Sequence, residues 1–87
     1  MKFLHYDLGF LNSGAVVIVT LDAQANVQLL DDSNLYAYRN GRRYTYYGGL
    51  AKQSPVRLGV PHAGTWHVAI DFGGYAGTVN ASVRVAA

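Results

Sequence analysis

The chain has 87 residues, a net charge of +2 and no cysteine, which excludes a second domain, a disulfide framework, a thiolate nucleophile and a cysteine-based zinc site. Because 51% of the residues are hydrophobic and only 14% are charged, disorder is excluded and one folded domain over residues 1–87 is expected. No apolar run approaches the roughly 20 residues of a membrane helix, and residues 1–7 lack the apolar core of a signal peptide. We therefore expect a cytoplasmic protein without a membrane partner.

Short segments with the period of a β-strand follow one another along the chain. Residues 3–8 and 27–30 are the weaker candidates, and residues 15–21 form a nearly continuous apolar run, which is typical of a strand buried on both faces. Three later segments alternate apolar and polar residues most clearly: 56–60, 66–72 and 78–85. Such alternation turns one side of each strand toward a core and the other toward solvent.

Residues typical of turns separate these segments. They are Asn12-Ser13-Gly14, residues 22–26, Gly48-Gly49, Ala63-Gly64, and Gly73-Gly74 with Gly77. Glycine and asparagine are favoured there because turns often need a positive φ. Short alternating strands between frequent turns predict an all-β fold, an antiparallel β-sandwich of jelly-roll-like character.

Residues 31–34, an Asp-Asp-Ser-Asn run, begin a segment that allows two structures. The run can cap a short helix, and the glycine of Asn40-Gly41 can end that helix. Alternatively, the same dipeptide is the turn of a β-hairpin, which would place Arg39 opposite Arg42. Because like charges directly opposite one another weaken strand pairing, we favour one short helical turn over residues 33–38.

No motif predicts catalysis. The serines lie in turns or in alternating strands, and none lies in a GxSxG nucleophile elbow. The adjacent carboxylates Asp31-Asp32 suit a helix cap better than the separated acid pair of a glycoside hydrolase. Gly48-Gly49 and Gly73-Gly74 lack the lysine and the spacing of phosphate-binding loops and are interpreted as turns. We therefore expect a protein that is not an enzyme and has no cofactor.

A histidine–aspartate cluster is the metal-binding alternative. His5 and Asp7 share one strand face, and His67 and Asp71 share another. If these strands were neighbours, four nitrogen and oxygen ligands could converge on zinc, nickel or manganese. However, Trp66 marks the core side of the second strand, so we expect His67 and Asp71 on the outer face, exposed to solvent. A metal-binding protein or an enzyme of unknown reaction is therefore the less favoured hypothesis.

One segment combines tyrosine with arginine and is the predicted binding surface. Its members are Tyr36, Tyr38, Arg39, Arg42, Arg43, Tyr44, Tyr46 and Tyr47. Tyrosine and arginine dominate protein interfaces, and aromatic rings also pack against sugars or stack on single-stranded nucleic acid. A net charge of +2 is small for a nucleic-acid-binding domain. The segment therefore predicts a non-catalytic module that recognises a protein partner, a second copy of itself or a small polar ligand, with carbohydrate or single-stranded nucleic acid as alternatives.

A family resemblance extends over essentially the whole chain. The stretches that carry it are residues 1–9 (MKFLHYDLG), 25–27 (ANV), 38–42 (YRNGR), 46–49 (YYGG), 54–56 (SPV), 64–68 (GTWHV), 70–71 (ID) and 73–75 (GGY). Together they resemble a bacterial family of unknown function, number eighteen-eighty-three in the series of such domains. The resemblance implies a compact β-sandwich that occurs alone or attached to TIR-type signalling domains. It assigns no functional residues, and Ile18, apolar where that pattern has a polar residue, is interpreted as part of a contact surface.

Overall fold

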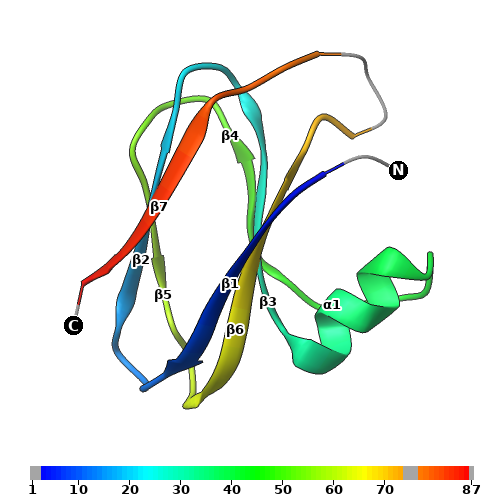
Figure 1. Cartoon of the computed structure of the whole chain (residues 1–87), viewed down its shortest axis with the longest axis vertical. Coiled ribbons are helices and arrows are strands. Elements are labelled where there is room, and N and C mark those ends of the chain that lie inside the picture. The colour runs from blue at the N-terminus through cyan, green and yellow to red at the C-terminus, as the bar shows by residue number, and fades with distance from the viewer. Residues whose placement is uncertain (1–2, 74–76, 87) are drawn as a thin grey trace.

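Seven strands in two antiparallel sheets and one helix form the part of the chain that the computed structural model describes, residues 3–73 and 77–86. The four-stranded sheet has the order β1 (Leu4–Leu11), β6 (Gly64–Asp71), β3 (Ala25–Asp31) and β4 (Tyr47–Ala51). The three-stranded sheet has the order β5 (Val56–Gly59), β2 (Val16–Leu21) and β7 (Ala81–Ala86). The sheets pack face to face, and helix α1 (Asp32–Arg39) lies on the outer side of the four-stranded sheet, which gives three layers (Figure 1).

This arrangement confirms the predicted all-β class, with two antiparallel sheets and one short helix. The jelly-roll-like character stays a prediction, because the sheet orders alone do not test it. Of the predicted turn at Gly73-Gly74 and Gly77, Gly74 lies outside the described residues. Within the described residues, no helix has the length and apolar character needed to cross a membrane.

Alternation along β6 builds the core, as the sequence predicts. Trp66, Val68 and Ile70 are buried between the sheets, and Nε1–H of Trp66 donates to the carbonyl oxygen of His62 at 3.0 Å. The same core contains buried residues of β2 in the facing sheet and of the neighbouring strand β3: Val17, Val19, Leu21, Ala25, Val27 and Leu29. Since burying one large aliphatic side chain contributes about 1.5–3 kcal/mol, this layer supplies most of the apolar stabilisation.

On the outer side of β2, arginines of both neighbouring strands lie beside an apolar residue. Ile18 lies directly between Arg57 of β5 and Arg84 of β7 and is buried. The prediction that residues 15–21 are buried on both faces is therefore confirmed at Ile18, whereas Thr20 on the same side is exposed. Long arginine side chains commonly cover an apolar neighbour with their methylene groups.

Helix α1 confirms the helical alternative and excludes the hairpin. The carboxylate of Asp31 caps the helix by accepting a hydrogen bond from the backbone N–H of Asn34 at 3.0 Å. Gly41 follows the helix with a φ of 66°, the left-handed conformation that commonly ends a helix. The buried side of α1 packs on the outer face of the four-stranded sheet through a small apolar cluster: Leu30, Leu35, Tyr38 and Ala69.

Strand β4 corrects the interpretation of Gly48-Gly49 as a turn. Both glycines lie within the strand and pair with Gln28 and Val27 of β3. Gly48 has a φ of 118°, and a Cβ there would overlap the carbonyl oxygen of Val27. The glycine therefore permits a close approach of two strands, and a sequence pattern does not distinguish this use of glycine from a turn.

Candidate functional site

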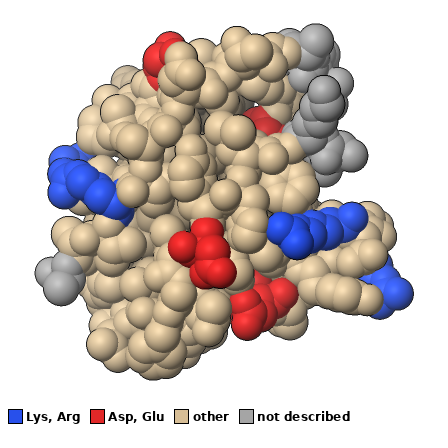
Figure 2. Space-filling model, viewed as in Figure 1, with Lys and Arg blue, Asp and Glu red and all other residues tan. Residues whose placement is uncertain are grey.

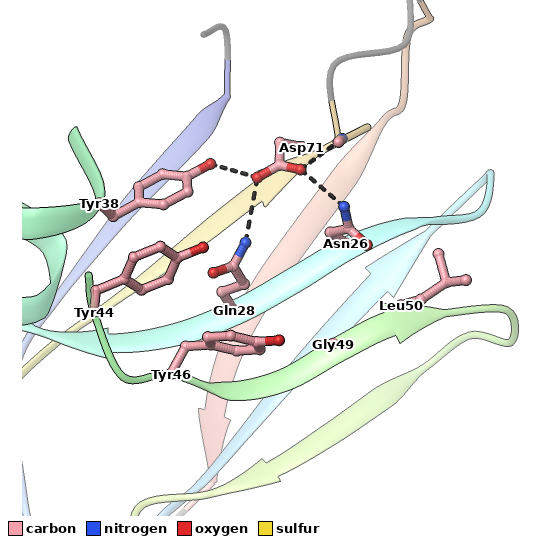
Figure 3. Close-up of a pocket in the computed structure, with 9 residues that line it drawn as sticks. Asn26, Gln28, Tyr38, Tyr44, Tyr46, Gly49, Leu50 and Asp71 are labelled. Atoms are coloured by element: carbon pink, nitrogen blue, oxygen red, sulfur yellow. Dashed lines mark hydrogen bonds between the residues drawn. The ribbon is translucent and has the colours of Figure 1, made fainter. Parts of the chain in front are cut away.

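A cavity of about 330 Å³ opens on the outer face of the four-stranded sheet beside α1. It is lined by Asn26, Gln28, Tyr38, Tyr44, Tyr46, Gly49, Leu50, Asp71 and Gly73 (Figure 3). We call it the tyrosine cavity. Its volume is near the lower end of the roughly 300–1,000 Å³ that small-molecule sites usually have.

Asp71, at the end of β6, forms the base of the tyrosine cavity and is only 4% exposed. One carboxylate oxygen accepts the hydroxyl of Tyr38 and, at 3.3 Å, Nε2–H of Gln28. The other oxygen accepts Nδ2–H of Asn26 at 3.0 Å and the backbone N–H of Gly73 at 2.7 Å. Each oxygen thus accepts two hydrogen bonds, and the carboxylate has no acceptor site left over.

These contacts hold the carboxylate of Asp71 in its charged form. Burial by itself raises the pKa of Asp71, but the hydrogen bonds from Tyr38, Asn26 and Gly73 outweigh it, and the pKa lies below its ordinary value. Burial, together with the hydrogen bond to the charged carboxylate, raises the pKa of Tyr38 far above the ordinary value for tyrosine. Tyr38 therefore remains a neutral donor, and Asp71 remains an anion.

Three tyrosines form one wall. The rings of Tyr38 and Tyr44 meet edge to face with centroids 5.1 Å apart, and the rings of Tyr44 and Tyr46 lie 5.6 Å apart. The hydroxyls of Tyr38 and Tyr44 point toward Asp71 and Gln28, and the hydroxyl of Tyr46 points toward Gly49 (Figure 3). Tyr38 donates to Asp71, and the hydroxyl of Tyr44 interacts with the side chain of Gln28, whereas the hydroxyl of Tyr46 makes no hydrogen bond with any described residue.

Gln28 of β3 presents a buried acceptor without a donor. The residue is 6% exposed, and its Oε1 has no hydrogen-bond partner among the described residues. Exchanging the oxygen and nitrogen of the Gln28 amide would not remove the problem. Nε2–H donates to the carboxylate of Asp71, and the exchange would place Oε1 against that negative charge. Burial raises the pKa of the adjacent Tyr44, and a polar interaction with Gln28 partly opposes this rise, but it does not satisfy Oε1. Buried acceptors almost always accept a hydrogen bond. We therefore expect a molecule in the cavity to donate one to Oε1.

The rim of the tyrosine cavity is apolar and exposed. Leu50 of β4 and Tyr46 are 54% and 46% exposed, respectively. Gly49 lies between them and leaves the cavity open, since no atom lies near the position that its Cβ would take. Large exposed apolar side chains beside convergent polar groups are typical of small-molecule sites.

The residues of the predicted tyrosine–arginine segment do not form one surface in the structure. Tyr38, Tyr44 and Tyr46 line the cavity, whereas Tyr47 turns its ring toward the core tryptophan, with centroids 6.0 Å apart. Arg42 lies over the ring of Tyr36 at 5.8 Å. The other two arginines of the segment, Arg39 and Arg43, are exposed and absent from the cavity lining. On the face shown in Figure 2, basic side chains lie at two opposite edges, over α1 and over the three-stranded sheet.

Sequence reasoning missed the polar side of β3 as part of the site. Asn26 and Gln28 alternate with the buried Ala25, Val27 and Leu29, so their outward direction could have been inferred. The same applies to Leu50, which lies in the strand that was interpreted as a turn. Asp71 was selected for a different site, the histidine–aspartate cluster.

That cluster forms only in part. β1 and β6 are neighbours, as the metal hypothesis requires, with Asp7 opposite His67, but Asp71 belongs to the tyrosine cavity. The prediction that His67 and Asp71 are exposed is wrong, because α1 and the tyrosines cover this sheet face, and His67 is 6% exposed. Among the described residues, no three histidine, aspartate or glutamate side chains are arranged to hold a metal ion.

Instead, two histidines connect the two ends of α1 through hydrogen bonds. Arg39, at the end of the helix, lies 3.0 Å from Nδ1 of His5, and Nε2 of His5 lies 3.0 Å from Nδ1 of His67. Nε2 of His67 lies 2.5 Å from the carboxylate of Asp32, the first residue of the helix. Because arginine only donates, Nδ1 of His5 must accept, and the pattern is satisfied when both rings are neutral and protonated at Nε2. The imidazole lone pairs that a metal would need are then already used.

We expect the domain to lose stability in mildly acidic solution through His5. Burial, followed by the positive charge of Arg39 and the neighbouring His67, lowers the pKa of His5 from 6.5, with Asp7 acting in the opposite direction. The unfolded chain therefore takes up this proton at a higher pH than the folded chain. The free energy of unfolding should fall as the pH drops below about 6.5, and should keep its full value above it.

Urea denaturation at about pH 7.5 and about pH 5.5 measures this loss. The variant His5→Gln should show a smaller loss between the two pH values than the wild type. His62→Gln, which changes an exposed histidine outside the hydrogen-bonded chain, should keep the loss of the wild type. An equal loss in His5→Gln and the wild type would contradict the assignment to His5.

Comparisons with known proteins bear on the family alone. No curated protein and no solved structure matches the chain. The model of one family, described as "Domain of unknown function (DUF1883)", matches residues 1–87, the whole length of the chain. The resemblance seen in the sequence is thereby confirmed, and the chain is a member of the DUF1883 family.

Proposed function

We propose that this protein is a non-catalytic binding module that holds a small polar ligand in the tyrosine cavity. One observation carries the proposal: the buried Oε1 of Gln28 has no donor among the described residues. It lies in a cavity that the hydroxyls of Tyr44 and Tyr46 also line, and neither hydroxyl donates a hydrogen bond to a described residue as that of Tyr38 does. A bound molecule with polar groups would satisfy all three. Convergent polar groups in a concave site are the usual mark of a binding site.

The state of Asp71 supports binding over catalysis. A general base or a nucleophile needs a free lone pair within reach of the substrate, whereas each oxygen of Asp71 already accepts two hydrogen bonds. The raised pKa of Tyr38 keeps that hydroxyl protonated and unsuited to act as a base. The carboxylate therefore orients Tyr38, Gln28 and Asn26 around the cavity.

The positions of the arginines give no support to single-stranded nucleic acid as the ligand. Phosphate recognition needs cationic side chains beside the stacking rings, but among the described residues that line the cavity only Asp71 is charged. A protein partner is supported less than a small ligand, because the tyrosines and arginines of the predicted segment make separate contacts. We also propose the cytoplasm as the location and, from the family resemblance, a bacterial origin and an association with TIR-type signalling domains.

The test is a ligand-observed NMR screen of small polar metabolites against the wild type and two matched variants. Tyr46→Ala removes a rim residue of the tyrosine cavity, and Tyr36→Ala removes an exposed tyrosine on α1 outside it. Ligands of the wild type should bind Tyr46→Ala at least about tenfold more weakly. A tenfold change in Kd corresponds to the binding free energy lost with one hydrogen bond and the packing of the tyrosine ring. Tyr36→Ala should bind as the wild type does.

Two results would contradict the proposal. One is the absence of any ligand at millimolar concentration. The other is equal binding by the wild type and Tyr46→Ala, which would place the ligand elsewhere on the molecule.

A further inference from the structure

We infer that the ligand of the tyrosine cavity is a neutral, polyhydroxylated molecule, a sugar or a polyol. The inference rests on the proposed function and narrows it to one chemical class. Three properties of the described residues lead to it: the charge of the lining, the hydrogen-bonding groups left without partners, and the apolar rim.

The charge of the lining disfavours anions. Of the lining residues that the structure describes, only Asp71 is charged at neutral pH, and Tyr38 and Tyr44 stay neutral there. A phosphate or carboxylate brought into the cavity would lose hydration and meet a like charge without a cation to compensate it. Sugar phosphates, nucleotides and acidic metabolites are therefore poor ligands.

The arrangement of Asp71 also gives a cation little to bind. An ammonium group binds well when it donates to a carboxylate or lies over the face of an aromatic ring. Asp71 is buried and already accepts four hydrogen bonds. The three tyrosines present their hydroxyl ends, and not a cage of ring faces, toward the cavity (Figure 3).

The polar groups of the lining require a ligand that donates and are well matched by one that also accepts. Oε1 of Gln28 accepts only, so the ligand must donate to it. The hydroxyls of Tyr44 and Tyr46 can donate or accept. A ligand hydroxyl has both capacities, and several hydroxyls on one small ring or chain can meet these three groups together.

The rim fits the carbon skeleton of such a molecule. Leu50 is half exposed and stands beside the opening, where the C–H face of a sugar ring would cover it. A sugar combines this apolar face with a hydroxyl edge, as the cavity combines an apolar rim with a polar base. A purely polar solute would leave Leu50 in water.

Isothermal titration calorimetry with three ligand panels tests the inference on the whole chain. The panels are neutral hexoses, pentoses and polyols; sugar phosphates and nucleotides; and amines, including choline. At least one neutral sugar or polyol should bind, and Tyr44→Phe, which removes only the hydroxyl, should weaken that binding about tenfold. Tyr47→Phe is the matched control, because its ring faces the core tryptophan, and it should bind as the wild type does.

Gln28→Leu supplies the second variant and should also weaken binding about tenfold by removing the acceptor. If this variant does not fold, Tyr44→Phe still decides the outcome. Tighter binding of an anion or an amine, weakened by Tyr46→Ala, would overturn the ligand class and leave the proposed function in place. Failure of all three panels to bind, or binding that Tyr46→Ala and Tyr44→Phe do not weaken, would overturn both.

Discussion

Replacing Asp71 by leucine is expected to lower the free energy of unfolding by about 3–5 kcal/mol. The substitution leaves four donors without their acceptor: the Tyr38 hydroxyl, the Gln28 and Asn26 amides and the Gly73 N–H. Tyr38 and Gln28 are buried, and a leucine side chain offers neither of them an acceptor in place of the carboxylate. Urea denaturation followed by circular dichroism measures the loss.

The matched control is Asp7→Leu in the neighbouring strand of the same sheet. Asp7 is largely exposed and accepts from the N–H of Gly9 at 2.9 Å, a donor that water can satisfy after the change. Its substitution should cost less than about 1 kcal/mol, as for most surface changes. Similar losses at the two positions would contradict the assigned role of Asp71 as the centre of a buried hydrogen-bond network.

Acid titration checks the same residue independently. The pKa of Asp71 is held below 3.8 in the folded protein, so the unfolded chain protonates first as the pH falls. The contribution of Asp71 to stability is therefore complete above about 3.8 and is lost as the pH falls below that value. In Asp71→Leu this part of the acid dependence should be absent.

Gly48→Ala is expected to have the second large effect, a loss of about 3–5 kcal/mol. The new Cβ would overlap the carbonyl oxygen of Val27, which is backbone and cannot rotate away, and the φ of 118° strains any other residue. Relief requires β4 to separate from β3, which would displace Gly49 and Leu50 of the tyrosine cavity. In a domain of this size the loss corresponds to a fall in Tm of more than about 12 °C.

Gly59→Ala in β5 is the control for this prediction. Gly59 has no positive φ, and its Cβ would meet no atom within 4 Å. Its Tm should lie within a few degrees of the wild type. A Gly48→Ala protein as stable as Gly59→Ala would show that β3 and β4 do not approach as closely as described.

The sequence predicts what depends on neighbours along the chain. Alternation at Trp66, Val68 and Ile70 places the core correctly because side chains of a strand alternate strictly. The run of residues 31–34 predicts that a helix begins there because capping is a local hydrogen bond, and the structure places the cap at Asp31. Both features depend on residues close together in the chain, so the sequence alone indicates them.

The candidate site was predicted only in part because its geometry depends on contacts between distant segments. Alternation shows that Asp71 faces away from the core, but not that α1 and Tyr44 cover that face. Likewise, Tyr46 and Tyr47 are adjacent in sequence, yet one lines the cavity and the other packs toward Trp66. A run of tyrosine and arginine therefore indicates a binding surface without indicating which members share it.

The most direct measurement is a ¹H–¹⁵N NMR titration of the labelled protein with the neutral sugar or polyol that binds best. If a hydroxyl donates to Oε1 of Gln28 in the tyrosine cavity, the largest shifts should occur at the side-chain amide of Gln28 and at the backbone N–H groups of Gly49 and Leu50. Shifts confined to the three-stranded sheet, or an unchanged Gln28 amide at saturating ligand, would contradict the account.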